Sequence, residues 1–502
     1  MPTPHPATTT AHSAGSSRRR PRYRGGMISV SCCRVAVLAS LLAAAAVTAF
    51  LTVSLPSSPS VSTMEHTEAG SLPPPHPALA TASPPSPLPS PSPSSSLPTP
   101  ATLAPPPPSS TRPRKREPSY WRMAPDDALR YAKKEIMAAE PVVDDVDLHA
   151  PLFKNVSQFK RSYELMERIL KVYIYQDGRR PIFHTPPLSG IYASEGWFMK
   201  LLKESQRFVV ADAARAHLFY LPYSSQQLRL SRLYVPNSHN LRPLSVYLRN
   251  FVKGLAAKYP FWNRTRGADH FIVACHDWGP YTTTAHRDLR KNSIKALCNA
   301  DSSEGIFVPG KDVSLPETTI RTPKRPLRYV GGLPVSRRRI LAFFAGNVHG
   351  RVRPILLQHW GDGQDDDMRV YALLPGRVSR TMDYIQHMKN SRFCLCPMGY
   401  EVNSPRIVEA LYYECVPVII ADNFVLPFSD VLNWNAFSVV VAEKDIPDLK
   451  KILQGISLRR YLAMHGCVKR LQRHFLWHER PVRYDLFHMI LHSIWLSRVN
   501  HV

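Results

Sequence analysis

Three residues with a definite spacing, Ser404, Arg406 and Glu409, lie where a loop leads into a predicted helix. The pair Ser404-Pro405 favours a helix start, because a hydroxyl suits the N-cap and proline suits the first turn. Arg406 would then lie where the helix dipole disfavours a cation, which suggests a bound anion rather than a solvated side chain. Glu409 would follow about 4.5 Å along the axis. The arrangement is typical of a nucleotide-sugar pocket, with Ser404 and Arg406 at a diphosphate and Glu409 on the ribose.

A second candidate anion loop follows the apolar run ILAFFA, in the sequence GNVHGRVRP. Gly346 and Gly350 would let backbone amides approach a phosphate, and Arg353 would add positive charge. The alternative is an ordinary turn with solvated arginines. Phe424, in ADNFVLPF, could line the same pocket or belong to the core.

Transfer of a sugar from such a donor requires a general base that deprotonates the acceptor hydroxyl. Asp277 and His276, in CHDWGP, follow a strand-like run directly and are our candidates, although Asp277 could instead cap a turn. Glu195, in IYASEGWF, is the alternative base. Glu401 forms an E-x7-E pattern with Glu409, and we assign Glu401 a structural or acceptor-contact role.

Strand-like runs that alternate with helical stretches must position these residues. This alternation predicts an α/β fold with parallel sheets covered on both faces, and ligands then bind beyond the carboxyl ends of the strands. A Pro/Arg-rich joint at 322–339 divides the pattern into two Rossmann-like lobes with a cleft between them. The expected strands are KVYIY, HLFYLPY, HFIVAC, ILAFFAG, VYALLP, FCLCP, VPVII and FSVVVA.

Metal and disulfide signals are weak. Asp365-Asp366-Asp367 contains a D-x-D, but its setting predicts a solvated surface loop, so we expect no metal site and no required cofactor, although a divalent metal remains compatible. Cys394 and Cys396 would share one face of a strand, which favours packing over a redox pair. The pattern of cysteines does not choose a disulfide pairing.

The N-terminal part differs in composition from the rest. Residues 35–55 carry no charge and are long enough to span a bilayer, and basic residues precede them, so we expect a type II signal anchor rather than a cleaved signal peptide. The Pro/Ser-rich run that follows predicts a disordered stem. The expected parts are a cytosolic basic tail (1–34), the transmembrane anchor (35–55), the stem (56–118), a helical lead-in or self-association element (119–169), an acceptor lobe (170–335) and a nucleotide-sugar lobe with a closing helix (336–502).

The formal net charge of +26 could indicate nucleic acid as a partner. No zinc-finger spacing or RNA-binding aromatic motif accompanies it, so we expect no nucleic-acid partner. A basic enzyme surface that attracts an anionic donor or a pectin-like polymer fits the composition better. Asn155 and Asn263 lie in glycosylation sequons and agree with a lumenal region.

Four long motifs occur in order: CHDWGP, FFAGNVHGRVRP, GYEVNSPRIVEALYYECVPVIIADNFVLPF and HFLWHERPVRYDLFHMILHSIW. Together they resemble the exostosin-type glycosyltransferases, in the plant branch that includes the xylogalacturonan xylosyltransferase group. The resemblance spans 171–498. It implies a GT-B-like fold, inverting transfer from a UDP-sugar, a polysaccharide acceptor of the hemicellulose or pectin type, and a Golgi lumenal site. It also implies that Arg353 faces the donor, and it leaves the sugar open.

We therefore expect a Golgi type II membrane glycosyltransferase that acts on a cell-wall polysaccharide, with a UDP-sugar donor. It would be attached to the membrane through one helix. It could also form an oligomer, either with other glycosyltransferases or with further copies of itself. Two alternatives remain. A non-catalytic carbohydrate-binding or scaffolding member of a synthase complex would keep the fold without the base. A glycoside hydrolase with two carboxylates would use water as acceptor and need no nucleotide.

Overall fold

The structure is a computed structural model that describes residues 119–142, 145–234, 240–324, 330–361 and 364–502. The basic tail, the transmembrane anchor and the stem expected over 1–118 lie outside these residues. The expected fold class has to be corrected on one point. The described part of the chain contains no helix that is both long and apolar enough to cross a bilayer. The architecture of this part is α/β, with two parallel sheets.

The first sheet is five-stranded, entirely parallel, and ordered β1-β2-β3-β4-β5. Its strands are β1 (Val172–Ile174), β2 (Leu218–Tyr220), β3 (His270–Ala274), β4 (Ile294–Leu297) and β5 (Val313–Ser314). The first three were expected from the sequence. The last two were not, because they are short and lack a distinctive apolar run.

The second sheet is also five-stranded and parallel, in the order β10-β9-β8-β6-β7. Its strands are β6 (Ile340–Ala345), β7 (Met368–Tyr371), β8 (Ser391–Pro397), β9 (Val416–Ile420) and β10 (Val439–Val440). All five overlap the expected runs, but β7 shares only Val370 and Tyr371 with VYALLP, and β10 is much shorter than FSVVVA. Parallel strands that continue through crossover helices in this way confirm the α/β prediction.

Helices cover both faces of each sheet. The α-helices are α2 (Pro125–Met137), α3 (Val156–Ile169), α4 (Ala193–Glu204), α5 (Ser225–Leu230), α6 (Arg242–Lys258), α7 (Phe261–Thr265), α8 (Arg287–Lys291), α9 (Val352–Trp360), α10 (Gly376–Thr381), α11 (Tyr384–Asn390), α12 (Arg406–Tyr412), α13 (Leu449–Gln454), α14 (Leu458–Leu471) and α15 (Leu486–Asn500). Short 3-10 helices lie in several connections.

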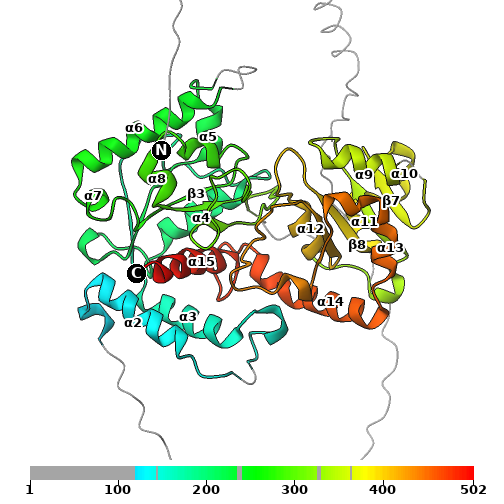
Figure 1. The fold of residues 1–502 in the computed structure, drawn as a ribbon, viewed down its shortest axis with the longest axis horizontal. Coiled ribbons are helices and arrows are strands. Elements are labelled where there is room, and N and C mark those ends of the chain that lie inside the picture. The colour runs from blue at the N-terminus through cyan, green and yellow to red at the C-terminus, as the bar shows by residue number, and fades with distance from the viewer. Residues whose placement is uncertain (1–118, 143–144, 235–239, 325–329, 362–363) are drawn as a thin grey trace, which may run out of the picture. The chain divides into compact units, whose positions relative to one another are not determined.

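Alternate residues of the strands enter different cores, as the two-residue period of a strand requires. In β2, Phe219 packs with α6 in one cluster, whereas Leu218 and Tyr220 pack in the larger cluster that contains α4 and α15. The larger cluster also receives Ala342 and Phe344 of β6, so one continuous core joins both lobes. Figure 1 shows α6 and α15 on opposite sides of the first sheet.

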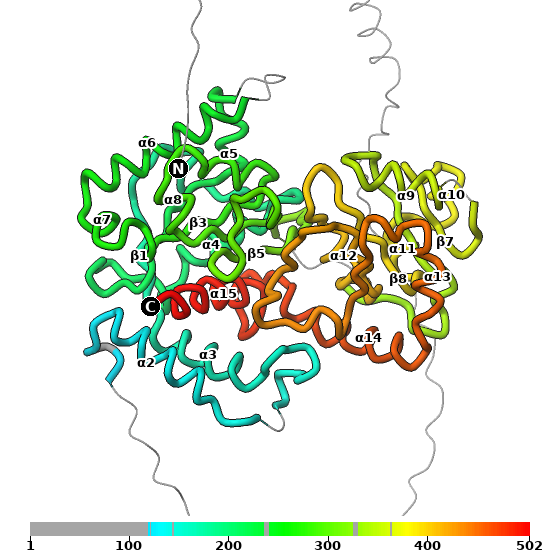
Figure 2. The backbone as a smooth tube through the Cα atoms, in the orientation of Figure 1, coloured from blue at the N-terminus to red at the C-terminus, as the bar shows by residue number. Residues whose placement is uncertain are grey.

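The closing helix α15 returns to the first lobe. It contacts α4, β4 and β5, and it also contacts the lead-in helices α2 and α3, which pack against one another. Figure 2 traces the lead-in (cyan) beside α15 (red). The expected amphipathic lead-in helix is therefore confirmed, and its apolar face is buried in the same chain rather than left free for self-association.

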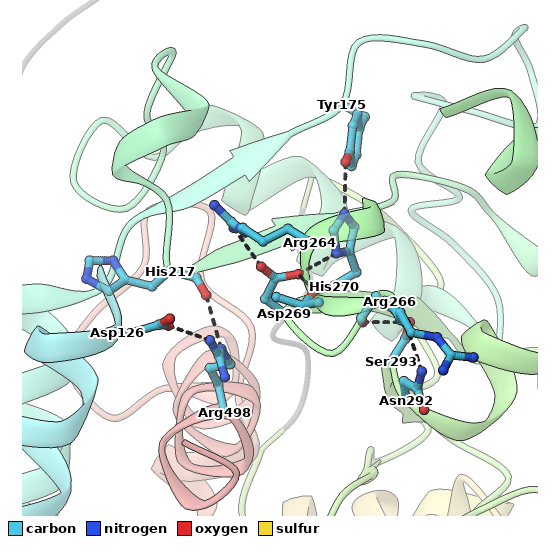
Figure 3. Close-up of polar contacts among 12 residues, drawn as sticks. Asp126, Tyr175, His217, Arg264, Arg266, Asp269, His270, Asn292, Ser293 and Arg498 are labelled. Atoms are coloured by element: carbon cyan, nitrogen blue, oxygen red, sulfur yellow. Dashed lines mark hydrogen bonds and ion pairs between the residues drawn. The ribbon is translucent and has the colours of Figure 1, made fainter. Parts of the chain in front are cut away.

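A polar network lies at the amino end of β3 and reaches Tyr175, the residue that follows β1 (Figure 3). Asp269 accepts hydrogen bonds from His270 Nδ1 at 2.7 Å and from Arg264 at 2.7 Å, and His270 Nε2 meets the Tyr175 hydroxyl at 2.8 Å. Arg498 of α15 pairs with Asp126 of α2 nearby. Burial opposes ionisation of Asp269, but the contacts with His270 prevail and lower its pKa to about 2. Because ligands bind at the opposite ends of parallel strands, we regard this network as structural.

Two disulfides lock neighbouring strands, one in each sheet. Cys275 and Cys298, just after β3 and β4, form one, and Cys394 of β8 forms the other with Cys415, just before β9. Cys396 is a buried free thiol, so Cys394 and Cys396 do not pair with each other, as expected.

The D-x-D segment is a surface loop, as predicted. Asp365 accepts hydrogen bonds from two backbone amides that follow it and pairs with Lys450 at 2.5 Å. Among the described residues, no group of three or more histidine, cysteine or acidic side chains is arranged to hold a metal ion.

Candidate active site

Arg406 lies at the carboxyl ends of the second sheet, where α12 begins. Its Nη2 donates to the Ala345 carbonyl at 2.8 Å, and its guanidinium lies 4.9 Å from the centre of the Phe344 ring. The alternative of a solvated Arg406 is therefore wrong. Ser404 is not the N-cap. Helix α12 begins at Arg406, one residue later than predicted, so Pro405 is the N-cap and no side chain caps the helix. The Ser404 Oγ instead accepts a weak hydrogen bond from Arg406 at 3.4 Å.

Arg353 of α9 shares the same aromatic ring. Its guanidinium lies 5.8 Å from the centre of Phe344, and its Nη1 donates to the Asn347 carbonyl at 3.0 Å. Burial, followed by the charge of Arg406, lowers the pKa of Arg353 to about 10. The side chain remains a cation at neutral pH, although burial and the neighbouring charge of Arg406 both disfavour the charged form.

Neither arginine forms an ion pair with any residue that the structure describes. The buried Nε–H groups of Arg353 and Arg406 also have no acceptor. Buried donors without partners are uncommon in native proteins, and two adjacent cations repel each other. An anion with several oxygen atoms would accept hydrogen bonds from both Nε–H groups and would offset the repulsion between the two cations. We call Arg353 and Arg406 the arginine pair.

Two glycines make room for the arginine pair. A Cβ at Gly346 would collide with the Arg406 guanidinium, and a Cβ at Gly399 would lie 2.9 Å from Arg353 Nη2. The sequence pointed to Gly346 for access of backbone amides to phosphate. The structure gives a different local reason, which is the close approach of a guanidinium.

Glu409 lies one turn beyond Arg406 and is half-buried. Tyr384 of α11 donates its hydroxyl to Glu409 Oε2 at 2.8 Å. Burial raises the pKa of Glu409, and the hydrogen bond from Tyr384 and the charge of Arg406 partly offset this rise. The sequence did not identify Tyr384, which orients the carboxylate.

Asp277 lies across from these groups, just beyond the carboxyl end of β3 and the Cys275 disulfide. Its carboxylate is half-buried, and burial raises its pKa, while a hydrogen bond from the Tyr192 hydroxyl lowers it in part. A carboxylate with a raised pKa is a stronger base than a solvated one.

Three carboxyl groups from different segments interact here: Asp277, Glu317 and Glu401, which we call the carboxylate cluster. Burial and then the charge of Asp277 raise the pKa of Glu401 to about 8. Burial also raises the pKa of Glu317 well above its usual range, with Asp277 and Glu401 adding to the effect and Arg353 opposing it. Asn299 donates a hydrogen bond to Glu401. Of the three, Asp277 is therefore the one best placed to be ionised at neutral pH.

His276 and Glu195 do not have the geometry of a base. His276 Nδ1 accepts the Trp278 amide at 3.1 Å, so in the neutral ring the proton lies on Nε2, and burial lowers the pKa of His276 to about 4. Glu195 is fully buried and accepts hydrogen bonds from Ser225 and from the Cys275 amide. Its oxygen atoms bind the chain itself, so we correct its expected role to a structural one.

Phe424 lies where the two lobes meet. It forms an isolated antiparallel bridge with Asp301, and the Val425 amide that follows donates to Ala300 at 3.0 Å. Its side chain is half-buried and packs against the cores of both lobes, so it does more than line a pocket.

Asn403 also joins the lobes, and sequence reasoning missed it. Its Nδ2 donates to the carbonyls of Cys298 at 2.8 Å and Leu315 at 3.1 Å, and its Oδ1 accepts the Ser404 amide at 2.7 Å. The loop that leads into α12 and Arg406 is thereby attached to the residues that follow β4 and β5.

Two of the missed residues, Asn299 and Glu317, share one cause. Asn299 and Glu317 follow β4 and β5, the two strands that the sequence did not predict. With those strands assigned, both residues would have stood at the carboxyl edge of the sheet. Tyr384 and Asn403 carry no such signal, because their roles depend on contacts across the fold.

Comparison with known proteins agrees with this geometry. Residues 166–456 match the family model described as the Exostosin GT47 domain. A probable glycosyltransferase of Arabidopsis thaliana is 48% identical over 376 residues, covering 74% of this chain and 71% of the relative. A probable beta-1,4-xylosyltransferase of Arabidopsis thaliana is 28% identical, covering 65% of this chain and 81% of the relative. A probable glucuronosyltransferase of Oryza sativa subsp. japonica is 29% identical, covering 65% of this chain and 77% of the relative.

The chain is thus a glycosyltransferase-type protein with two α/β lobes. It belongs to the exostosin GT47 family, and the relatives named above are plant proteins, in agreement with the motifs. Membership implies a nucleotide-sugar donor and a carbohydrate acceptor. Among solved structures, TarM matches with a TM-score of 0.24 and 10% identity, covering 52% of this chain and 58% of that chain, which is too remote to carry an argument.

Proposed function

We propose that this protein is an inverting glycosyltransferase that moves a sugar from a UDP-sugar to a cell-wall polysaccharide of the hemicellulose or pectin type. The observation that carries the proposal is the arginine pair, a buried and a half-buried cation that lie side by side, each with a buried Nε–H donor without an acceptor and with no carboxylate partner in the described chain. A diphosphate supplies the charge and the acceptors that both groups need. Glu409, oriented by Tyr384, would accept a ribose hydroxyl.

In the proposed reaction, Asp277 acts on the acceptor and the arginine pair, which lies across from it, holds the donor. Asp277 takes the proton of the acceptor hydroxyl, whose oxygen attacks the anomeric carbon from the face opposite the diphosphate. The bond from that carbon to the phosphate oxygen breaks, and its electron pair leaves with UDP. Arg353 and Arg406 stabilise the negative charge that develops on the diphosphate, so no metal ion is required in this scheme.

We further propose that the protein acts in the Golgi lumen. The disulfides Cys275–Cys298 and Cys394–Cys415 support this location, because such bonds persist in the oxidising secretory pathway and are rare in the cytosol. The exposed sequon at Asn155 is compatible with it.

UDP release tests the reaction. The protein is incubated with a panel of UDP-sugars and cell-wall oligosaccharides, in buffer with and without EDTA. We expect acceptor-dependent UDP release that persists in EDTA and falls about 100-fold or more in Asp277→Asn. Acceptor-independent release would indicate hydrolysis.

A scaffolding role makes a different prediction. A non-catalytic member would bind UDP and oligosaccharides yet release no UDP with any pair in the panel. That outcome would contradict the proposed transfer while leaving the donor site intact.

A further inference from the structure

A row of aromatic side chains lies beside Asp277 and is not used in the reaction above. Ring centres of Tyr192 and His276 are 4.6 Å apart, those of His276 and Trp278 are 5.2 Å apart, and those of Trp278 and Tyr234 are 4.7 Å apart. Tyr192, Trp278 and Tyr234 are only half-buried. We call these four residues the aromatic platform.

The platform is connected directly to the candidate base. The Tyr192 hydroxyl lies close enough to Asp277 to lower the pKa of its carboxyl group in part, against the effect of burial, and Trp278 is the next residue in the chain. Neighbouring rings are tilted by 38–56°, so each partly exposed ring presents a face of its own. A single aromatic face suits the C–H face of a sugar ring, because such side chains combine a large apolar face with polar edges. A sugar stacked there would lie within reach of the group that must deprotonate it.

One cation extends over the platform. The Arg229 guanidinium lies 5.6 Å from the centre of the Trp278 ring, on an exposed side chain at the end of α5. It forms no ion pair with any residue in the described ranges, and its charge lowers the pKa values of both His276 and Asp277, although burial dominates each. Arg229 therefore lies near the base without being neutralised by it.

Arginine is the side chain that best recognises a carboxylate, through two parallel hydrogen bonds. A solvated arginine over tryptophan also occurs on ordinary surfaces, but such a site does not usually lie next to a candidate base. The raised pKa values of Glu317 and Glu401 favour their uncharged forms, which do not repel an acidic ligand.

We propose that the aromatic platform and Arg229 form the acceptor subsite and that the acceptor is a uronic-acid-bearing glycan. A sugar ring stacks on Trp278, and the carboxylate of that sugar or its neighbour binds Arg229. This inference rests on the proposed function and narrows its acceptor to an acidic polysaccharide.

Binding of matched oligosaccharides tests the subsite. The probes are a galacturonic acid oligomer and the same oligomer with its carboxyl groups reduced, titrated into the full lumenal chain at two salt concentrations. We expect the acidic oligomer to bind at least 10-fold more tightly at low salt and to lose most of that advantage in Arg229→Ala. Trp278→Ala should weaken both oligomers, and Trp278→Phe should restore binding of both in part.

Arg249→Ala is the control, because Arg249 is a half-buried arginine of the same lobe whose side chain hydrogen-bonds to its neighbour Asn250. It should leave both affinities unchanged. Equal affinity for the acidic and reduced oligomers, or an unchanged preference in Arg229→Ala, would overturn the inference. UDP affinity, measured in parallel, separates the two claims: its absence in the unaltered protein contradicts the proposed donor site, whereas its retention in Arg229→Ala shows that only the acceptor subsite is affected.

Discussion

Two guanidinium groups over one phenylalanine ring are unfavourable in the absence of a ligand. Arg353 and Arg406 repel each other, and each leaves a buried donor without a partner. A protein tolerates such strain in polar groups mainly where function requires it. The repulsion and the orphaned donors would both be relieved by a diphosphate, which is why the pair carries the donor assignment.

Gly346 should act through Arg406 rather than through its own amide. Gly346→Ala places a methyl group against the Arg406 guanidinium, so we expect UDP affinity to fall about 10-fold as the guanidinium shifts. In an Arg406→Ala background the same substitution should have no further effect. The measurement is a double-mutant cycle of UDP affinities. Additive losses would show that the glycine contacts the donor directly.

Glu401 should make stability depend on pH. Its pKa is raised from an ordinary value of 4.5 to about 8, so between about pH 5 and pH 8 the folded state keeps a proton that the unfolded state loses. Stability from this group is therefore complete below pH 4.5 and declines as pH rises through 8. Glu401→Gln retains an acceptor for Asn299 and removes the titration. Relative to the unaltered protein, its free energy of unfolding should rise by on the order of 2 kcal/mol from pH 5 to pH 8 in denaturant titrations. Parallel pH profiles of the two proteins would contradict this.

At the scale of elements, the site depends on how strand ends are held together. The Cys275–Cys298 disulfide joins the segments after β3 and β4, which carry Asp277 and Asn299. The Cys394–Cys415 disulfide joins β8 and β9, which flank α12. Each bond thus fixes the spacing of two segments that carry or flank residues of the candidate site.

Loss of the first disulfide should therefore affect stability and transfer together. We expect Cys275→Ser with Cys298→Ser to lower the free energy of unfolding by about 3 kcal/mol, since the bond closes a loop of 23 residues. Transfer should also fall, because Asp277 loses its anchor, whereas UDP affinity should be retained. Thermal unfolding and UDP release provide the two readouts. A normal rate in the folded double variant would show that Asp277 is positioned by other contacts.

The sequence predicts the elements that carry strong local patterns. The Ser404-Pro405 step, the run VPVII and the alternation of strands and helices led correctly to the parallel sheets and to Arg406 at a helix start. Strand β4 was missed because its Lys295 reads as polar, although it is buried in a pair with Asp312 at 2.8 Å. Asn299 and Glu317 were missed with the strands β4 and β5 that they follow, whereas Tyr384 and Asn403 depend on contacts between segments distant in sequence, which no local pattern encodes. The capping role of Ser404 and the basic roles of His276 and Glu195 failed because hydrogen bonds inside the fold occupy those groups.

At the scale of the whole molecule, a continuous core and a few polar contacts join the lobes. Asn403 bonds two carbonyls of the first lobe, and the segment around Phe424 pairs with the segment around Asp301. The donor groups come from one lobe and Asp277 from the other, so transfer requires that the lobes keep their spacing.

Asn403→Ala tests that requirement. It leaves two buried carbonyls unpaired, at about 1–3 kcal/mol each, and we expect a lower melting temperature and faster proteolysis between the lobes. UDP release should fall more than UDP affinity, because only the reaction needs both lobes. Equal losses of affinity and rate would indicate that Asn403 serves the donor site alone.

The central claim is that Arg353 and Arg406 bind the diphosphate of the donor, and calorimetric titration of UDP tests it most directly. Arg351 is the matched control, since it lies in the same segment but is exposed and paired with Glu443 at 2.7 Å. We predict that Arg353→Ala and Arg406→Ala each weaken UDP binding at least 10-fold and that Arg351→Ala leaves it unchanged. Equal UDP affinity in all three variants and the unaltered protein would contradict the claim.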